Sequence, residues 1–216
     1  MSARTLADFS VADLQAALSS RGFKRSHAEP LLRSFYDAGD ESGWADLRLP
    51  RGMAGKLREE FLLNRPAQVA RQVAEDGTTK LLLKLADGRT VETVMMTDFR
   101  DDRVAGCVSS QVGCAMGCDF CATTKSGFER NLTAGEIVEQ FLALRREAAA
   151  VGKRVQTLVF MGMGEPMLNL DNVLEAVRRI APNELGALGW RQITVSTVGI
   201  VPGIDAMAAA DLNIHL

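Results

Sequence analysis

The sequence lacks any long apolar run. None of its 216 residues lies in a stretch approaching the roughly 20 apolar residues that a membrane-spanning helix needs. The N-terminus also lacks the unbroken apolar segment of a secretory signal. With 47% hydrophobic and 24% charged residues, the composition is that of a soluble globular protein. We therefore expect a cytoplasmic protein with no membrane contact.

An excess of charge of one sign is also missing, since the formal net charge is -2. Nucleic-acid binding usually requires a basic face, and such a face can coexist with a near-neutral total charge. The charge therefore neither supports nor excludes RNA as a partner. A local cluster of cations in the N-terminal part is either an RNA contact or a solvated face. It consists of Arg21, Lys24, Arg25 and Arg33.

Histidine and cysteine are scarce, and the cysteines are clustered. The two histidines, His27 and His215, lie far in sequence from the four cysteines, which all fall between Cys107 and Cys121. A disulfide framework would join distant parts of a small secreted chain. The clustering therefore indicates a metal site.

The first hundred residues predict a helical domain followed by strands. Apolar residues recur at helical spacing in residues 10–18, 26–38 and 50–63, with Ser10 and Asp13 as a capping pair. Strand patterns follow at 68–74, 79–85 and 90–96, separated by two Asp-Gly turn signals. We predict a helical N-terminal domain over residues 1–65 and a β-meander linker over residues 66–100.

From residue 101 to residue 216 the pattern alternates between strand and helix. Repeated units of this kind predict an α/β fold with a parallel sheet. Such a sheet is normally covered on both faces, whereas this one would stop at an unpaired edge. We therefore expect an incomplete barrel. The predicted strands are 104–112, 155–161, 191–197 and the start of one at 212–216, and the predicted helices are 133–149, 170–180 and 201–209.

Three cysteines form a CxxxCxxC motif at Cys114, Cys118 and Cys121. Iron-sulfur clusters generally take four protein ligands, so three thiolates leave one iron open for a further ligand. The spacing resembles that of the radical S-adenosylmethionine (SAM) superfamily, in which the open iron of a [4Fe-4S] cluster binds SAM. Phe120, directly before the last cysteine, fits the same pattern.

Two other readings of the cysteines remain open. A zinc site would need four ligands and could recruit Cys107 as the fourth, although structural zinc sites usually pair two short knuckles. Inert buried thiols would be an unusual use of three cysteines in one short motif.

Gly164 and Glu165 follow the apolar strand predicted at 155–161, at the end of a strand where α/β folds place their ligands. Glycine admits close approach to the backbone, and a glutamate accepts hydrogen bonds from an ammonium group. An ordinary turn is the alternative, but after a CxxxCxxC motif the segment resembles the superfamily's Gly-Glu-Pro element, which holds the methionine ammonium. Ser196, at the end of the next strand, is a candidate contact to the cofactor or a helix cap.

Several continuous motifs resemble the RlmN/Cfr group of RNA adenine methyltransferases. They are CVSSQVGC at 107–114, GFERNL at 127–132, MGMGEPMLN at 161–169 and STVG at 196–199. The order of helical domain, β linker and barrel is similar too, and the resemblance covers essentially the whole chain. It implies a partial (β/α)6 radical SAM barrel, of which this chain would hold the first half.

The resemblance implies methyl transfer to carbon 2 of an adenosine in 23S rRNA, and in some members in tRNA, or to carbon 8 in the Cfr branch. These carbons are not nucleophilic, so radical chemistry is needed. One SAM methylates a cysteine near the C-terminus of such an enzyme, and a second SAM supplies the radical that activates that methyl group. An electron donor such as flavodoxin or ferredoxin is an implied partner.

By the same resemblance, Cys107 corresponds to the second catalytic cysteine, which forms a disulfide with the methyl-carrying cysteine, and Glu92 corresponds to the proton acceptor. Taken alone, Cys107 could be a buried spectator thiol and Glu92 a solvated side chain. No cysteine follows Cys121. We therefore expect a fragment that does not complete methylation. Another radical enzyme, such as a maturase or mutase, and a non-catalytic zinc or RNA-binding module remain open.

Overall fold

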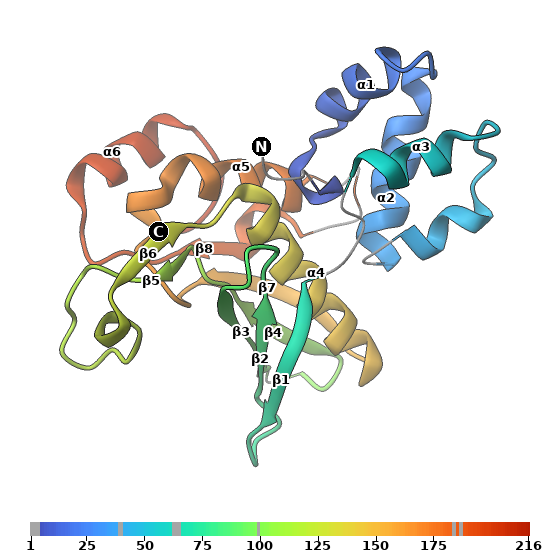
Figure 1. The fold of residues 1–216 in the computed structure, drawn as a ribbon. Coiled ribbons are helices and arrows are strands. Elements are labelled where there is room, and N and C mark those ends of the chain that lie inside the picture. Colours follow the sequence, from blue (N-terminus) through green and yellow to red (C-terminus); the bar gives the residue numbers. More distant parts are fainter. Residues whose placement is uncertain (1–4, 39–40, 62–65, 99, 183–184, 186–187) are drawn as a thin grey trace.

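The chain forms a helical lobe followed by an α/β lobe (Figure 1). The computed structural model describes residues 5–38, 41–61, 66–98, 100–182, 185 and 188–216. The helical lobe contains η1 (Leu6–Asp8), α1 (Val11–Ser19), η2 (Arg25–His27), α2 (Ala28–Ala38), η3 (Glu41–Asp46) and α3 (Met53–Glu60), where η marks a 3-10 helix. The α/β lobe contains β1 (Ala67–Val73), β2 (Thr79–Lys84), β3 (Thr90–Thr97), β4 (Arg103–Cys107), β5 (Gln111–Gly113), η4 (Thr123–Ser126), β6 (Phe128–Asn131), α4 (Ala134–Ala150), β7 (Arg154–Phe160), η5 (Pro166–Asn169), α5 (Leu170–Ile180), η7 (Trp190–Gln192), β8 (Ile193–Val195) and α6 (Val201–Ala209).

Capping boxes begin two of the α-helices, α1 and α4. Ser10 accepts a hydrogen bond from the Asp13 amide, and the Asp13 side chain accepts one from the Ser10 amide, which completes a capping box on α1. Thr133 and Glu136 form the same box on α4.

The third predicted helix is shorter than expected, because α3 ends at Glu60. Residues 62 and 63 of that prediction lie outside the described part of the chain.

The predicted meander is confirmed, but it belongs to a larger sheet. The strand order is β1-β2-β3-β4-β7-β8, with antiparallel pairing from β1 to β4 and parallel pairing from β4 to β8. Val94 of β3 lies opposite Cys107 of β4. A bridge between Thr194 and His215 marks parallel pairing beyond α6. The predicted parallel sheet is therefore the second half of a mixed sheet.

The prediction of one strand over residues 104–112 is wrong. β4 ends at Cys107, and β5 pairs with β6 in a separate two-stranded sheet. The chain turns between them because the amides of Ser110 and Gln111 both donate to the Met163 carbonyl, at 2.8 and 3.1 Å, instead of continuing the ladder with β7. This turn directs β5 and the loop after it away from the main sheet.

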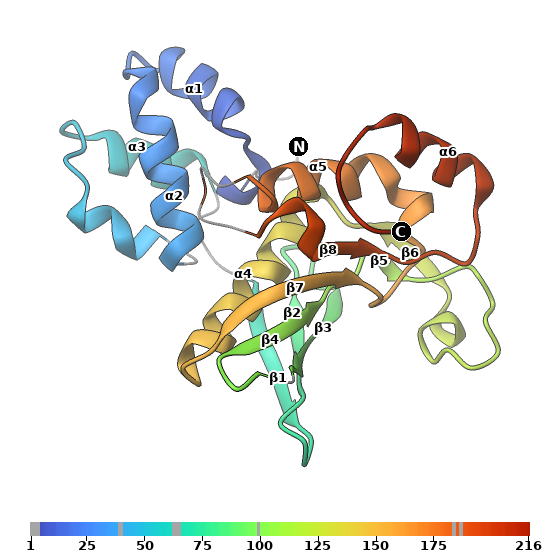
Figure 2. The same cartoon turned by 180° about the vertical axis from the view of Figure 1, so that it is seen from behind.

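One face of the main sheet packs against α4, and the opposite face is less covered. Val91 and Met95 of β3 are buried, whereas Glu92, Val94 and Met96, which point the other way, are half-buried. Figure 2 views the sheet from the less covered side, with α4 behind the strands. Among the described helices and strands, none packs over that face as α4 does over the other. Because β4, β7 and β8 run parallel, their C-terminal ends lie at the same edge of the sheet.

A buried acid lies where the N-terminal segment contacts α4. Glu139 of α4 is 8% exposed, and Thr5 of the N-terminal segment hydrogen-bonds to its carboxyl group. The Arg179 guanidinium of α5 donates to the Ala7 carbonyl at 2.9 Å and so holds the same segment. Burial raises the pKa of Glu139 to about 8, and the charges of Asp8 and Glu136 act in the same direction, against Arg146. The folded protein therefore prefers the neutral acid.

This preference predicts that the free energy of unfolding falls as pH rises. The unfolded chain releases the Glu139 proton near pH 4.3, whereas the folded chain keeps it until about pH 8, so each step upward in this window favours unfolding. Glu139→Gln should flatten the dependence and stabilise the protein at pH 8 by on the order of a few kcal/mol. Urea denaturation at a series of pH values measures the free energy of unfolding of both proteins. Glu59→Gln, at an exposed position of α3, is the control. An equal pH slope in the wild type and Glu139→Gln would contradict the prediction.

Candidate functional site

The three clustered cysteines lie on the loop between β5 and β6. Antiparallel pairing of these strands brings the ends of the loop together, and the Cys114 amide donates to the Gly127 carbonyl at 2.9 Å. Cys114 is buried, whereas Cys118 and Cys121 are half-buried, and all are free thiols. The Cys121 amide donates to the Cys118 carbonyl at 3.0 Å. One short loop thus presents three thiols.

Backbone hydrogen bonds shape this loop and act on one thiol. Gly117 adopts a left-handed conformation with φ of 73°, and its amide donates to the Thr124 hydroxyl at 2.8 Å. The Thr124 amide donates to the sulfur of Cys121, and this bond, with a second from Thr123, lowers the pKa of the Cys121 thiol. The thiolate is the form that binds metal ions. The loop therefore favours the ligating form of Cys121.

The donor set fits an iron-sulfur cluster by its chemistry. Three free thiols come from one loop, and the sequence has no histidine near them. Three thiolates are one ligand short of the four that a structural zinc site requires, and they match a cluster with one open iron. Among the described residues, no three Cys, His, Asp or Glu side chains converge on one point that could hold a metal ion. The fit therefore rests on the ligand types and their loop.

Glu165 connects the segment after β7 with the segment after β8. Its side chain is buried, and its two carboxylate oxygens accept hydrogen bonds from the amides of Met167 at 3.0 Å and Val198 at 2.9 Å. Its own amide donates to the Gln111 side chain at 2.9 Å. A buried carboxylate requires such partners. Each carboxylate oxygen has a second lone pair, so the group can still accept a proton donor from a ligand.

Gly164 lies in contact with β5 and must be glycine. Its φ is +99°, and a Cβ atom on it would lie 2.5 Å from the Cβ atom of Gln111. Gly162 is equally constrained, since its Cβ atom would lie 2.7 Å from the Ser109 hydroxyl. The sequence predicts that glycine in this loop lets a ligand approach the backbone. In the structure, the space that a Cβ atom would take at both glycines is occupied by a neighbouring segment of the chain.

Ser196 follows β8 directly and is half-buried. The next residue, Thr197, accepts hydrogen bonds from the amides of Gly199 at 3.1 Å and Ile200 at 3.5 Å. The Thr197 hydroxyl therefore organises the turn into α6. The structure places Ser196 at the same edge as Glu165, because β7 and β8 run parallel and the Val198 amide reaches the Glu165 carboxylate.

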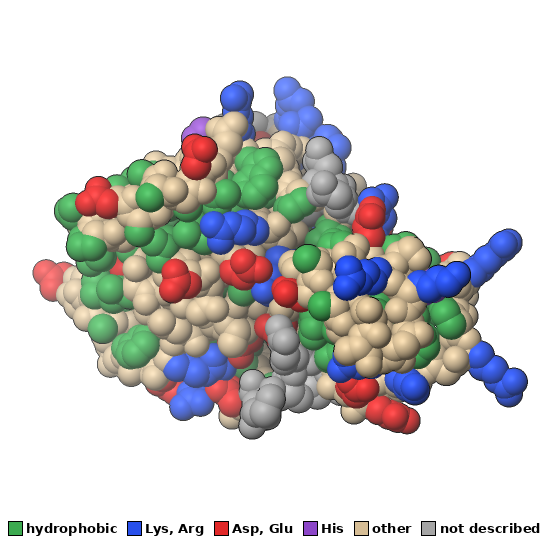
Figure 3. Space-filling view, turned by 90° about the horizontal axis from the view of Figure 1, so that it is seen from above, with side chains coloured by type: hydrophobic (Ala, Val, Ile, Leu, Met, Phe, Trp, Pro, Cys, Tyr) green, Lys and Arg blue, Asp and Glu red, His purple; other side chains and the backbone are tan. Residues whose placement is uncertain are grey.

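The rim of this edge is apolar. Leu168, Val198 and Val201 are 42%, 56% and 63% exposed, and Phe120 in the cysteine loop is 93% exposed. Figure 3 shows hydrophobic side chains gathered over the lobe that carries α5 and α6. Ligand sites commonly combine apolar walls with a few polar groups that fix orientation. The loops after β5, β7 and β8 offer both.

Glu92 and Cys107 share the less covered face of the sheet. Cys107 lies opposite Val94, and Glu92 is two residues from Val94 on the same strand, so their side chains point to the same side. Glu92 pairs with Lys80 at 2.9 Å and is partly exposed. Burial raises the pKa of the Cys107 thiol, although the Met161 amide donates to its sulfur. Cys107 therefore favours the protonated form at neutral pH.

The cationic cluster of the helical lobe is partly neutralised. Arg21 pairs with Glu60, and Arg33 pairs with Glu29 at 2.9 Å. Lys24 precedes η2 and Arg25 begins it. Surface pairs of this kind leave only a modest basic field. This face therefore supports RNA contact less than the four cations alone suggest.

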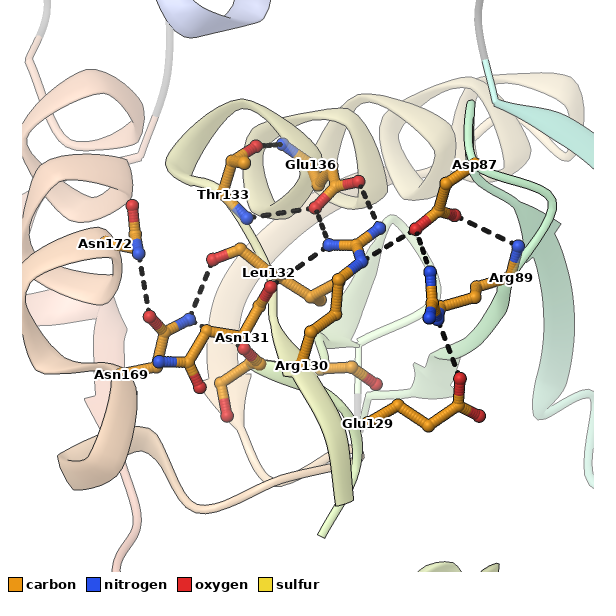
Figure 4. Close-up of polar contacts among 12 residues, drawn as sticks. Asp87, Arg89, Glu129, Arg130, Asn131, Leu132, Thr133, Glu136, Asn169 and Asn172 are labelled. Carbon is orange, nitrogen blue, oxygen red and sulfur yellow. Dashed lines mark hydrogen bonds and ion pairs between the residues drawn. The ribbon is translucent and has the colours of Figure 1, made fainter. Parts of the chain in front are cut away.

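A set of ion pairs that no local sequence pattern predicts holds the return strand of the cysteine loop (Figure 4). Arg130 of β6 donates two parallel hydrogen bonds to Glu136, each 2.8 Å, and a third to Asp87 at 2.7 Å. Arg89 donates to the same Asp87 carboxylate at 2.8 Å and to Glu129 at 2.7 Å. Burial acts to raise the pKa of Asp87, but these bonds outweigh it and hold that pKa well below its usual range. The β2–β3 turn, β6 and the start of α4 are thus joined.

Arg130→Gln is expected to lower the free energy of unfolding by about 1 to 3 kcal/mol, because charged hydrogen bonds to two carboxylates are lost. Arg33→Gln is the matched control, since Arg33 forms an exposed pair whose loss should cost at most about 0.5 kcal/mol. Urea denaturation at low and high salt compares them. If the two substitutions cost the same, Arg130 does not hold β6 in the way described.

The superfamily follows from this fold and from comparison with known proteins. The chain belongs to the radical SAM superfamily, whose family model matches residues 108–215, a segment that includes the cysteine loop and the loop after β7. Within it, the chain is 66% identical over 212 residues to the probable dual-specificity RNA methyltransferase RlmN 1 of Opitutus terrae, covering 98% of this chain and 60% of that protein. It is 39% identical over 214 residues to the probable dual-specificity RNA methyltransferase RlmN of Thermotoga neapolitana, covering 99% of this chain and 61% of that protein.

A solved structure has the same fold. The crystal structure of a radical SAM methyltransferase from Sphaerobacter thermophilus superposes with a TM-score of 0.90 at 38% identity, covering 98% of this chain and 62% of that chain. The chain thus spans about 60% of the length of the relatives it matches. The predicted fold class, α/β with the first part of a radical SAM barrel, is confirmed: the structure is a mixed α/β fold with a partial sheet and matches this radical SAM methyltransferase. Membership of the superfamily implies SAM and an iron-sulfur cluster as cofactors.

Among the described residues, we find no helix with the length and apolar character that a membrane crossing needs.

Proposed function

We propose that this protein acts in the methylation of carbon 2 of adenosine in 23S rRNA, with tRNA as a second substrate, by radical SAM chemistry through a methyl-cysteine intermediate. The observation that carries the proposal is the contact between two loops. The cysteine loop follows β5, and Gln111 of β5 bonds directly to Glu165 in the loop after β7. The high identity to proteins named RlmN supports the carbon 2 branch over the Cfr-type carbon 8 branch.

The residues divide into ligands and reacting groups. Cys114, Cys118 and Cys121 would hold the [4Fe-4S] cluster, which supplies the electron that cleaves SAM when it is bound. Gly164 and Glu165 would hold the methionine moiety: the buried carboxylate of Glu165 accepts from the ammonium group, and Gly164 admits the close approach of Gln111 to this loop. The apolar side chains of the rim would exclude water from the reacting atoms. Ser196 would contact the remainder of the cofactor.

Cys107 and Glu92 would act on the substrate side. The Cys107 thiol is held protonated by burial, which suits a group that becomes reactive only when a partner approaches. In the proposed reaction its sulfur, after losing its proton, attacks the sulfur of the methyl-carrying cysteine; the bond from that sulfur to the transferred carbon breaks, and the electron pair leaves with the carbon, which is protonated to the methyl group on the adenine. Glu92, partly exposed on the same face, would accept the proton that leaves the adenosine carbon. Lys80, paired with Glu92 at 2.9 Å, would hold its carboxylate in place.

Anaerobic reconstitution of the chain with iron and sulfide tests the cofactor part of the proposal. We expect about four iron atoms per chain and formation of 5'-deoxyadenosine from SAM after reduction with dithionite. Iron analysis and mass spectrometry measure both. A chain that holds about one zinc and no iron would overturn the proposal in favour of a zinc module.

RNA is the proposed macromolecular partner, and reduced flavodoxin or ferredoxin is the proposed electron donor. Both partners imply a cytoplasmic location. Equilibrium binding of a 23S rRNA fragment and of a DNA duplex of equal length, each at several salt concentrations, tests the RNA part. Tighter binding of the rRNA fragment is expected. Equal binding of both nucleic acids would contradict a role for this chain in RNA recognition.

A further inference from the structure

A buried glutamine connects the two loops that carry the proposed cofactor ligands. Gln111 lies on β5, three residues before Cys114, and is 1% exposed. Its side-chain oxygen accepts a hydrogen bond from the Glu165 amide at 2.9 Å, and its backbone amide donates to the Met163 carbonyl at 3.1 Å. Both partners belong to the loop after β7. The strand that leads into the cysteine loop is thus bonded on both sides of Gly164.

The side-chain nitrogen of Gln111 extends this connection to the other strand of the cysteine loop. It donates to the side-chain oxygen of Asn131 at 2.8 Å, and Asn131 lies opposite Gln111 in the β5–β6 ladder. The Asn131 amide group then donates to the Leu168 carbonyl at 3.2 Å. Two side-chain amides therefore link the strands on either side of the cysteine loop to the segment around Glu165. Gln111 of β5 bonds to Glu165, and Asn131 of β6 bonds to Leu168.

Packing leaves little freedom at this contact. The Gly164 backbone lies so close to Gln111 that an added Cβ atom would approach the Gln111 Cβ and backbone nitrogen to 2.5 and 2.7 Å. Real side chains essentially never meet at such distances, so no layer of water or side chains separates the two loops. The Gln111 residue is therefore in direct contact with Gly164 and, through its side-chain oxygen, with the Glu165 amide.

We propose that Gln111 is a positioning residue that sets the cysteine loop relative to the Gly-Glu-Pro loop. The inference rests on the proposed function, because it assigns the first loop to the cluster and the second to the methionine moiety of SAM. Bond cleavage at a cluster requires the two reactants to be held in one geometry, and a misplacement of about 1 Å can cost on the order of a hundredfold in rate. The Gln111 side chain touches both sides of this separation, and the Asn169 side chain supports the same contact by donating to the Ser110 and Leu132 carbonyls at 2.7 and 2.8 Å.

A purely structural role would give a different result. Gln140 of α4 provides the comparison, since it is equally buried and bonds to the same stretch of chain, accepting from the Ser109 amide at 2.8 Å and donating to the Ser109 carbonyl at 3.0 Å. Its side chain bonds to the Ser109 backbone and to the Glu136 carbonyl, and among the described residues it has no hydrogen bond to the segment around Glu165. Gln111→Leu and Gln140→Leu therefore remove buried amides of the same type and differ in whether the lost group joins the two loops.

Hydrogen exchange on the chain without cofactors is the first readout. In Gln111→Leu, the amide of Glu165 loses its acceptor, so its exchange should accelerate by at least about tenfold, together with amides of the cysteine loop. In Gln140→Leu, the Glu165 amide should keep its protection. Asn131→Leu, at an exposed position, should give a smaller change of the same kind and serves if Gln111→Leu does not fold.

SAM binding to the reconstituted protein is the second readout. Gln111→Leu should retain the iron content of the wild type and bind SAM at least about tenfold more weakly, as measured by the change that SAM causes in the EPR spectrum of the reduced cluster. Gln140→Leu should bind SAM as the wild type does. Wild-type affinity in Gln111→Leu, or an equal loss in Gln140→Leu, would overturn the inference. If the wild type itself binds no iron, the proposed function is wrong. If the hydrogen exchange rate of the Glu165 amide is unchanged in Gln111→Leu, the positioning role is wrong, whatever the iron content.

Discussion

Cys118→Ala is expected to abolish cluster binding by this protein. Cys118 is half-buried and lies on a loop rather than in the core, so its loss should change the free energy of unfolding by no more than about 0.5 kcal/mol. Removing one of three thiolates leaves two, which is too few to retain a cluster whose fourth iron has no protein ligand. Iron content after anaerobic reconstitution should therefore fall from about four atoms per chain to nearly none.

Cys107→Ala is the matched control for this experiment. Cys107 ends β4, and we assign it to the substrate side of the site, so its removal should leave the iron content unchanged. The pair of variants also distinguishes iron from zinc. If Cys107→Ala loses its metal together with Cys118→Ala, all four cysteines act as ligands and the assignment of Cys107 is wrong. If Cys118→Ala keeps the full iron content, the CxxxCxxC motif does not bind the cluster.

Gly113→Ala is expected to destabilise the fold by several kcal/mol. Gly113 has a φ of +74°, a conformation that costs a residue with a Cβ atom roughly 1 to 2 kcal/mol. The added Cβ atom would also lie 1.9 Å from the Gly127 carbonyl oxygen. That oxygen accepts the Cys114 amide at 2.9 Å, so moving it breaks the hydrogen bond that closes the cysteine loop. Overpacking of this kind adds about 1 to 3 kcal/mol.

Gly117→Ala separates the two causes. Gly117 has nearly the same conformation, with a φ of +73°, but a Cβ atom there meets nothing within 4 Å. It should therefore cost only the conformational part, about 1 to 2 kcal/mol. Thermal and urea denaturation of both variants give the comparison, and the iron content of Gly113→Ala should fall as well. Equal costs for the two substitutions would show that the contact with Gly127 imposes no constraint.

Local chemistry explains where the sequence predicts elements well. The Ser10 and Thr133 capping boxes act within three residues, so the starts of α1 and α4 are readable from the sequence. The turns at Asp76-Gly77 and Asp87-Gly88 act within four residues and correctly separate β1, β2 and β3. The error over residues 104–112 arose because the turn after β4 depends on the Met163 carbonyl, more than forty residues away along the chain.

The same distinction applies to the candidate site. The ligand types are readable from the amino-acid order: three cysteines at a spacing that one loop can present, and a glycine and an acid at the end of a strand. How these groups are held depends on the folded chain, in which Gln111 bonds to Glu165 across 54 residues and Arg130 bonds to Asp87 across 43. Ligand identity is a property of side-chain chemistry, which the sequence states directly. Separation and orientation depend on strand register and on contacts between distant segments, which no local pattern encodes.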